Sequence, residues 1–170
     1  MLGLSACQQL DSTPNVGPCP VAGVLFDAER QVEIVGEELH ENVAWTGAIE
    51  GVSGFCRYTD DNPITMEIEI DFAFGRGPMA DGREKTFNYF VAVTRRDRVV
   101  LAKQITPITA KFDSDETVVR LTEEVGGIEI PRATSTVSGT NFEVLVGFEL
   151  TPEQLAFNRA GKRFRMQVRE

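Results

Sequence analysis

Histidine and cysteine, the side chains that most often carry nucleophilic or metal chemistry, are scarce in this sequence. The chain has a single histidine, His40, in the acidic segment 36–42, and three cysteines. A Ser–His–Asp or Cys–His device needs a histidine beside its nucleophile, and zinc or copper sites usually combine several such ligands. We therefore expect His40 to be an exposed loop residue, and we expect neither catalysis nor a cofactor.

Oxygen-rich segments are the next candidates, because Ca²⁺ takes roughly six to eight oxygen ligands. Asp60 and Asp61 are adjacent within residues 59–63, and residues 113–116 form a second acidic segment. Neither segment has the spacing of an EF-hand loop, and Asp and Asn often bond their own backbone in turns. We expect turns in both places, with Asp60 and Asp61 as weak calcium candidates and no other metal site.

The segment 75–83 has the most unusual composition, with Arg76 and Arg83 among three glycines. Guanidinium groups bind carboxylates and phosphates through paired hydrogen bonds. The segment lacks the strand-to-helix setting of a P-loop or a dinucleotide fingerprint. Two interpretations stay open: contact with a partner or ligand, or a plain mobile hairpin loop whose glycines adopt positive φ.

Basic residues gather near the C-terminus of an otherwise acidic chain. The net charge is −9, which argues against nucleic acid as a partner. The basic cluster consists of Arg159, Lys162, Arg163, Arg165 and Arg169. It has two interpretations: docking onto an acidic partner, or pairing with the acidic face of the same domain.

The first residues carry a motif with a covalent meaning. Leu4-Ser5-Ala6-Cys7 places two small residues between a leucine and a cysteine. This motif resembles the lipobox of bacterial lipoproteins. The resemblance implies that residues 1–6 are the remnant of a signal peptide, that Cys7 carries acyl chains such as palmitate, and that residues 7–18 are a flexible linker. Two or more acyl chains anchor a protein firmly to a membrane, whereas one chain binds only marginally.

The same resemblance implies a location on the periplasmic face of the bacterial envelope. Gln8 and Gln9 follow the cysteine where an Asp would favour the inner membrane, so the outer membrane is the expected site. Disulfides persist in exported proteins. If Cys7 is acylated, Cys19 and Cys56 remain as a pair, and we expect a disulfide between them. The alternative is two buried thiols that pack as small apolar side chains.

The body of the chain, residues 19–170, is dominated by strand patterns and is expected to form one domain. Apolar and polar residues alternate over residues 64–74, which predicts one buried and one wet face. Residues 86–94 are apolar on both faces and predict a central strand, and residues 142–150 alternate again. The carboxylates on the wet face are Glu67, Glu69 and Asp71. Glycosidases use paired carboxylates, but an ordinary solvated sheet face explains these three.

Further strand patterns complete the domain. They cover residues 21–26, 31–35, 44–58, 99–106, 118–125, 127–130 and 163–169. We expect hairpins around residues 27–30 and 95–98, and we expect residues 118–130 at a sheet edge. About nine or ten short strands without a βαβ rhythm predict an antiparallel all-β sandwich, immunoglobulin-like or transthyretin-like.

Only one segment predicts a convincing helix, and it precedes the last strand. Thr151 is an N-cap, Pro152 occupies the first helical position, and Gln154 completes a capping box. Gly161 is the expected stop. The helix is much shorter than the roughly 18 apolar residues that a membrane span needs.

An anchored domain without a catalytic constellation predicts a non-catalytic accessory or scaffold subunit of a membrane-associated assembly. The expected partner is an envelope protein, and an exposed sheet edge is one way to bind it. The side chains proposed for partner contact are Arg76, Arg83, Arg163 and Arg165. The alternative is a periplasmic small-ligand or cation-binding module.

Overall fold

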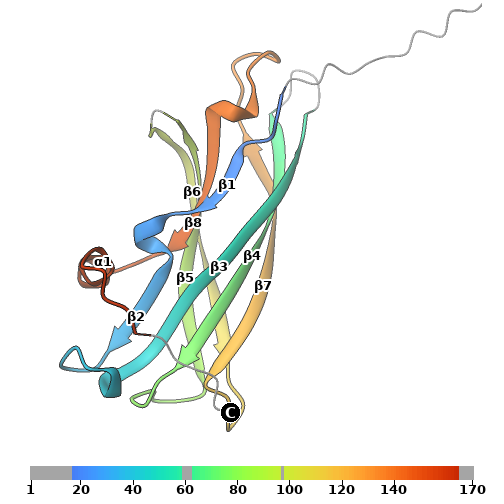
Figure 1. The fold of residues 1–170 in the computed structure, drawn as a ribbon. Coiled ribbons are helices and arrows are strands. Elements are labelled where there is room, and N and C mark those ends of the chain that lie inside the picture. The colour runs from blue at the N-terminus through green and yellow to red at the C-terminus, as the bar shows by residue number, and fades with distance from the viewer. Residues whose placement is uncertain (1–16, 59–62, 97, 165–170) are drawn as a thin grey trace, which may run out of the picture.

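A computed structural model describes residues 17–58, 63–96 and 98–164 of the chain (Figure 1). Over these residues the chain forms eight strands, three short 3₁₀ helices and one α-helix. The strands are β1 (Val21–Val24), β2 (Arg30–Ile34), β3 (Val43–Arg57), β4 (Ile64–Arg76), β5 (Glu84–Arg95), β6 (Val100–Lys111), β7 (Val118–Ile130) and β8 (Phe142–Phe148). The helices are η1 (Phe26–Ala28), η2 (His40–Asn42), η3 (Gly139–Asn141) and α1 (Pro152–Arg159).

The strands pair into two four-stranded sheets with the orders β1-β8-β5-β6 and β2-β3-β4-β7. All neighbouring strands are antiparallel except β1 and β8, which are parallel. Figure 1 shows the two sheets as layers of long, twisted strands. The sequence-based prediction of an all-β sandwich is confirmed.

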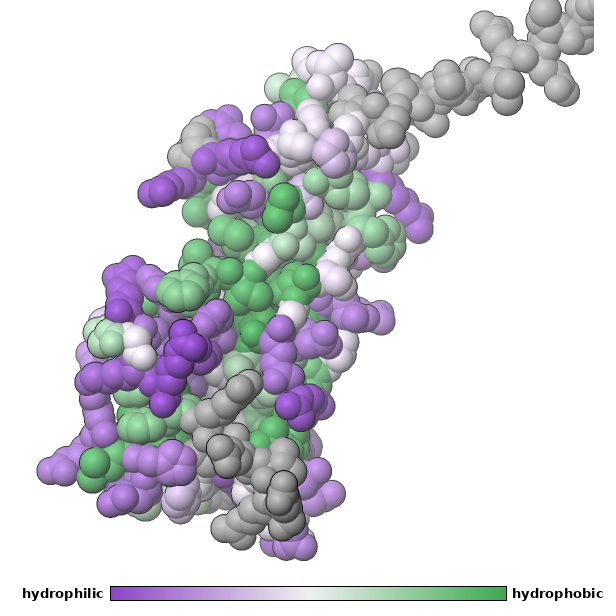
Figure 2. Space-filling model, viewed as in Figure 1, coloured by the Kyte–Doolittle hydropathy of each residue, from purple (hydrophilic) through white to green (hydrophobic). Residues whose placement is uncertain are grey.

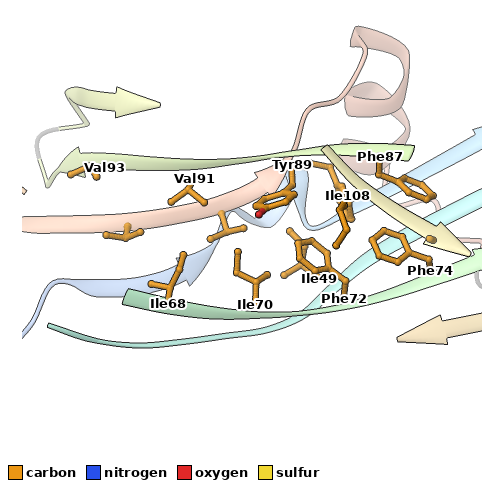
Figure 3. Packing of buried hydrophobic residues seen from close by; sticks show 14 of the residues in the cluster. Ile49, Ile68, Ile70, Phe72, Phe74, Phe87, Tyr89, Val91, Val93 and Ile108 are labelled. Carbon is orange, nitrogen blue, oxygen red and sulfur yellow. The ribbon is translucent and has the colours of Figure 1, made fainter. Parts of the chain in front are cut away.

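The core between the sheets follows from the alternation in β4. Every second residue of β4 from Ile64 to Phe74 is buried, and the residues between them up to Asp71 are exposed. Figure 3 shows these side chains meeting those of β5. The ring of Phe74 stacks on that of Phe87 with centroids 4.6 Å apart, and Tyr89 lies 5.1 Å from Phe72. Each such buried aromatic ring contributes about 1.5–3 kcal/mol to stability.

β5 is apolar on both faces because both faces are covered. It lies between β6 and β8, as the central strand predicted from residues 86–94. One face contributes Phe87 and Tyr89 to the main core, whereas Phe90 and Ala92 form a smaller cluster with Ala28 of η1. The predicted hairpin of β5 and β6 is also confirmed, with Arg98 in the turn at φ 69°.

The hairpin predicted around residues 27–30 is wrong. β1 pairs with β8 in one sheet, and β2 pairs with β3 in the other. The chain crosses between the sheets through η1, where the N–H of Leu25 donates to Val146 O and Ala28 is buried. The polar residues of this segment resemble a turn locally, but the small side chain of Ala28 packs against Gly147, which no local pattern reveals.

Two other strand predictions differ from the structure. Residues 118–130 form one strand, β7, whose pairing with β4 shifts between Met66 and Ile68. Gly127 lies near this irregularity with φ +70°, so the two predicted pieces are one bulged edge strand. Of the predicted strand 163–169, Arg163 and Phe164 are not in a strand, and the remainder lies outside the described residues.

α1 forms where the capping box predicts it. Thr151 Oγ1 accepts from the N–H of Gln154, and the Gln154 side chain accepts from the N–H of Thr151. At the other end Gly161, at φ +71°, and Lys162 donate to carbonyls of the last turn in a Schellman arrangement. Phe157 packs on β2 and β3. No helix in the described part of the chain is long and apolar enough to cross a membrane.

Candidate functional site

Pro18 and Cys19, just before β1, are joined to one end of the sandwich. Cys19 and Cys56 form a disulfide with a Cα–Cα distance of 5.6 Å, as predicted. Close by, the hydroxyl of Tyr58 donates to Pro18 O and accepts from the N–H of Gly139, both at 2.7 Å. These contacts therefore join three segments: the residues just before β1, the end of β3, and η3. The proposed lipidation site, Cys7, lies outside the described residues.

Gly139 allows this junction because it has no side chain. A Cβ at this position would lie 2.7 Å from both Pro18 O and the Tyr58 hydroxyl. The guanidinium of Arg132 lies over the Tyr58 ring, 5.3 Å from its centroid, and orients the ring further. The base of the N-terminal segment is thus held by a covalent bond, two hydrogen bonds and a cation–π contact.

The glycine-rich segment is a crossover between the sheets, not a hairpin loop. It links β4 in one sheet to β5 in the other. The N–H of Gly77 donates to Ala44 O at 2.7 Å, and that of Met79 donates to Val43 O at 3.1 Å. A Cβ on Gly77 would lie 2.1 Å from Val43 O, so this glycine serves a close backbone approach and not a positive φ.

Arg76 and Arg83 do not converge on a binding site within this crossover. Arg76 donates through Nη2 to Ser114 O at 2.9 Å, and its guanidinium lies 6.0 Å from the centre of the Phe112 ring. Arg83 is exposed, and its carbonyl accepts from the N–H of Phe112. The Arg76 side chain and the Arg83 backbone thus contact the segment 112–114. Their proposed role in partner contact stays a prediction.

The basic C-terminal cluster pairs partly within the domain. Arg159 Nε lies 2.9 Å from Asp27 Oδ2, and Lys162 forms an ion pair with Glu38. These carboxylates belong to η1 and to the segment before η2. Pairing within the domain therefore occurs, but it does not involve the exposed carboxylates of β4. Arg163 is exposed, whereas Arg165 and Arg169 lie outside the described residues.

Arg163 lies at the rim of a groove of about 750 Å³ on the outer face of the β2-β3-β4-β7 sheet. The pairing register explains the hollow, because Thr46 is opposite Gly75 and Ala48 is opposite Ala73. These small side chains form the floor, and longer ones rise around it. The rim includes Arg30, Glu50, Arg120, Arg163 and Phe164.

The rim combines three guanidinium groups with two carboxylates. Arg30 pairs with Glu29 at 2.8 Å, and Arg120 Nε lies 2.9 Å from Glu50 Oε2. The hydrogen bond and charge of Glu50 raise the pKa of Arg120 above its ordinary value. The Nε of Arg30 is buried without a hydrogen-bond partner. Such a set of donors suits a carboxylate or phosphate group.

Arg30 and Arg120 are groove residues that the sequence analysis missed. They lie on β2 and β7, the two outer strands of the sheet, and only strand pairing brings them to one groove. The local signal was an arginine at a solvent-facing strand position, which is common and not specific.

The remaining candidates do not line this groove. His40 is exposed in η2, with its ring edge-on to Phe164 at 6.0 Å. In the segment 113–116, the N–H of Asp113 donates to Glu116 Oε2 at 3.1 Å, as in an ordinary turn. Asp60 and Asp61 lie outside the described residues. Over the residues that the structure describes, no group of three or more His, Cys, Asp or Glu side chains is placed to hold a metal ion.

Comparison with protein-family models, with curated proteins and with solved structures finds no match for this chain. Its function is therefore inferred from its own residues.

Proposed function

We propose that this protein is a lipid-anchored envelope protein that acts as a non-catalytic accessory or scaffold subunit of a membrane-associated assembly. The observation that carries the proposal is the Cys19–Cys56 disulfide at the base of the N-terminal segment. Disulfides persist in oxidising compartments, which agrees with export. The lipobox-like residues 4–7 supply the membrane anchor, and the outer membrane is the proposed location.

The position of the disulfide suits a tethered domain. Residues 7–18 would span on the order of 30 Å when extended, and they lead directly to Cys19. A mechanical force on the lipid anchor would be transmitted through the disulfide to β3. This strand has fifteen residues and pairs with a neighbour on both sides. The anchor would thus hold the protein at the membrane, and the linker would let the domain extend away from it. The sandwich would offer a partner a rigid surface.

The titratable groups with displaced pKa values lie apart from one another within the described residues. Catalytic sites usually bring together groups with displaced pKa values. Burial raises the pKa of Tyr89 in the core, and a hydrogen bond from its own backbone N–H lowers the pKa of Glu153 at the start of α1. Tyr89 is buried in the core between the sheets, Glu153 is exposed at the start of α1, and Arg120 lines the groove on the outer face of one sheet, so these three groups are not gathered in one site.

The proposal is tested by labelling growing bacteria with an alkyne analogue of palmitate and separating membranes from soluble proteins. We expect label and membrane association for the wild type, and neither for Cys7→Ser. Cys56→Ser is the matched control, because it removes another cysteine and is expected to keep the label. Label on Cys7→Ser, or a soluble wild type, would contradict the anchor. Turnover of an envelope substrate with defined kinetics would contradict the non-catalytic role.

A second candidate function, a small-ligand binding module, is favoured by the groove and its three arginines. Arg163 is exposed and lines the groove. Thermal shift with citrate and with inorganic phosphate tests this candidate. A rise in Tm that Arg163→Ala abolishes, and that Arg83→Ala leaves unchanged, would favour an anionic ligand over a scaffold role.

A further inference from the structure

The β6 strand leaves one edge of its sheet open. It is the last strand in the order β1-β8-β5-β6 and pairs with β5 alone within that sheet. Residues 99–105 are all exposed, and four of them are large and apolar: Val99, Val100, Leu101 and Ile105, with exposed fractions of 44%, 59%, 36% and 50%. An open apolar strand edge is a surface that another strand can extend.

The backbone of this edge has hydrogen-bonding groups that point away from the sheet. The carbonyl of Asn88 accepts from the N–H of Glu149 on the β8 side, so Asn88 does not use its backbone toward β6. Its register partner on β6 is Pro107, which has no N–H to donate. Because bonding alternates along an antiparallel pair, the N–H and C=O groups of Lys103 and Ile105 also face outward.

The lysine of this part of β6, Lys103, does not shield the strand edge. A lysine often keeps an edge solvated and unpaired. Here Lys103 turns back over the sheet, where its Nζ lies 4.4 Å from the centre of the Phe90 ring and 2.7 Å from Glu149 Oε2. Pro107 removes a backbone donor from the edge only beyond Thr106. Residues 99–105, which lie nearer the β5–β6 turn, are exposed.

Positive charge collects at the open end of this edge although the chain as a whole is acidic. Arg95, Arg96 and Arg98 are exposed at the β5–β6 turn. Figure 2 shows hydrophilic side chains over this end of the hairpin, at the upper left. Beside the turn lies a pocket of about 510 Å³ whose lining includes Arg95, Arg96 and Leu101. At physiological salt, charges beyond about 8 Å are largely screened, so the turn itself, with three arginines and the single carboxylate of Asp97, sets the local field and the net charge of the chain does not.

We propose that β6 binds an extended, apolar segment of a partner protein that pairs antiparallel with residues 99–106 and ends in carboxylates beside Arg95, Arg96 and Arg98. This inference rests on the scaffold role proposed above and specifies its partner surface. Alternate side chains of the segment pack on Leu101 and Ile105, and its backbone bonds to Lys103 and Ile105. A second copy fits less well, because a two-fold pairing brings the arginine turn of each copy toward Lys111 of the other.

The test uses the full chain and a fluorescent, acetylated peptide of alternating valine and threonine that ends in two glutamates. Binding is measured by anisotropy, and exchange of the Lys103 and Ile105 amide protons is followed by NMR. We expect saturable binding that slows exchange of both amides, and at least about tenfold weaker binding for an amidated peptide that ends in two lysines.

Ile105→Pro is the decisive variant, because it removes an outward donor without removing a bond to β5. We expect at least about tenfold weaker peptide binding with the thermal unfolding transition retained. Ile105→Val keeps both the N–H and a β-branched apolar side chain, and it is the matched control, with binding retained. Arg96→Glu is expected to weaken the glutamate peptide and to strengthen the lysine peptide.

Equal affinity for both peptides, or undiminished binding by Ile105→Pro, would overturn the proposal. Dimerisation of the full chain that Ile105→Pro abolishes, without peptide binding, would also overturn it and would make a second copy the occupant. Palmitate labelling at Cys7 is an independent readout. Label without peptide binding leaves the anchor standing and removes this inference, whereas peptide binding without label does the reverse.

Discussion

The hydroxyl of Tyr58 donates a hydrogen bond to the carbonyl oxygen of Pro18 at 2.7 Å, one residue before the disulfide cysteine Cys19. The same hydroxyl accepts from the N–H of Gly139 at 2.7 Å. One oxygen thus joins the segment before β1 to η3. Tyr58 is 40 residues from Pro18 and 81 residues from Gly139 in the sequence. The contact and the disulfide hold the same end of the sandwich.

Tyr58→Phe removes this oxygen and leaves the ring in place. We expect a loss of about 1–3 kcal/mol in the free energy of unfolding, because Pro18 O and the Gly139 N–H both lose their partner. Denaturant titration measures the loss. Because Tyr58 and Cys19 fasten the same segment, the effect should shrink when the disulfide is also removed. Strictly additive effects would show that the two contacts act independently.

Removal of the disulfide should cost more than any single hydrogen bond. The bridge joins residues separated by 37 positions, which corresponds to about 3–4 kcal/mol in the chain-entropy treatment. Cys19→Ala combined with Cys56→Ala is expected to lower the midpoint of urea unfolding accordingly. Cys7→Ala is the control and should leave the midpoint unchanged. A loss below about 1 kcal/mol would mean that the bridge contributes little to folding.

Gly77 and Gly82 lie in the same crossover but should tolerate a methyl group differently. A Cβ on Gly77 would meet Val43 O at 2.1 Å, whereas nothing lies within 4 Å of a Cβ on Gly82. Neither residue has positive φ. We expect Gly77→Ala to lower stability by about 1–3 kcal/mol and Gly82→Ala to change it little. Equal effects on Tm would contradict the close approach of Gly77 to β3.

Tyr89 should make the protein sensitive to alkaline pH. Burial, and then the negative charge of Glu123, raise the pKa of Tyr89 above 10.0, and a hydrogen bond with Thr106 opposes them. A raised pKa in the folded state means that the stability is present below the unfolded pKa and is lost as pH rises through the folded pKa. We therefore expect the free energy of unfolding to fall above about pH 10.

The Tyr58→Phe variant isolates this titration, because the chain has only two tyrosines. Tyrosinate absorbance should then report Tyr89 alone, with a pKa above 10.0. Glu123→Gln removes the neighbouring charge and should lower that pKa. A titration unchanged by Glu123→Gln would show that the two side chains do not interact.

Local patterns predicted the elements whose signals are contained in a few residues. The alternation from Ile64 to Phe74 fixes which face of β4 is buried, and the capping box at Thr151 fixes the start of α1. Long-range contacts decided the rest. The crossover at η1 depends on Ala28 packing against Gly147, and the role of Gly77 depends on Val43 O. Arg30 and Arg120 meet at one groove only because β3 and β4 pair in one register.

The proposed acylation of Cys7 is tested by the mass of the intact protein purified from native membranes. We predict a mature chain that begins at Cys7 and carries the added mass of its acyl chains, with Cys19 and Cys56 oxidised. A chain that retains residues 1–6 and carries no added mass on Cys7 would contradict the account.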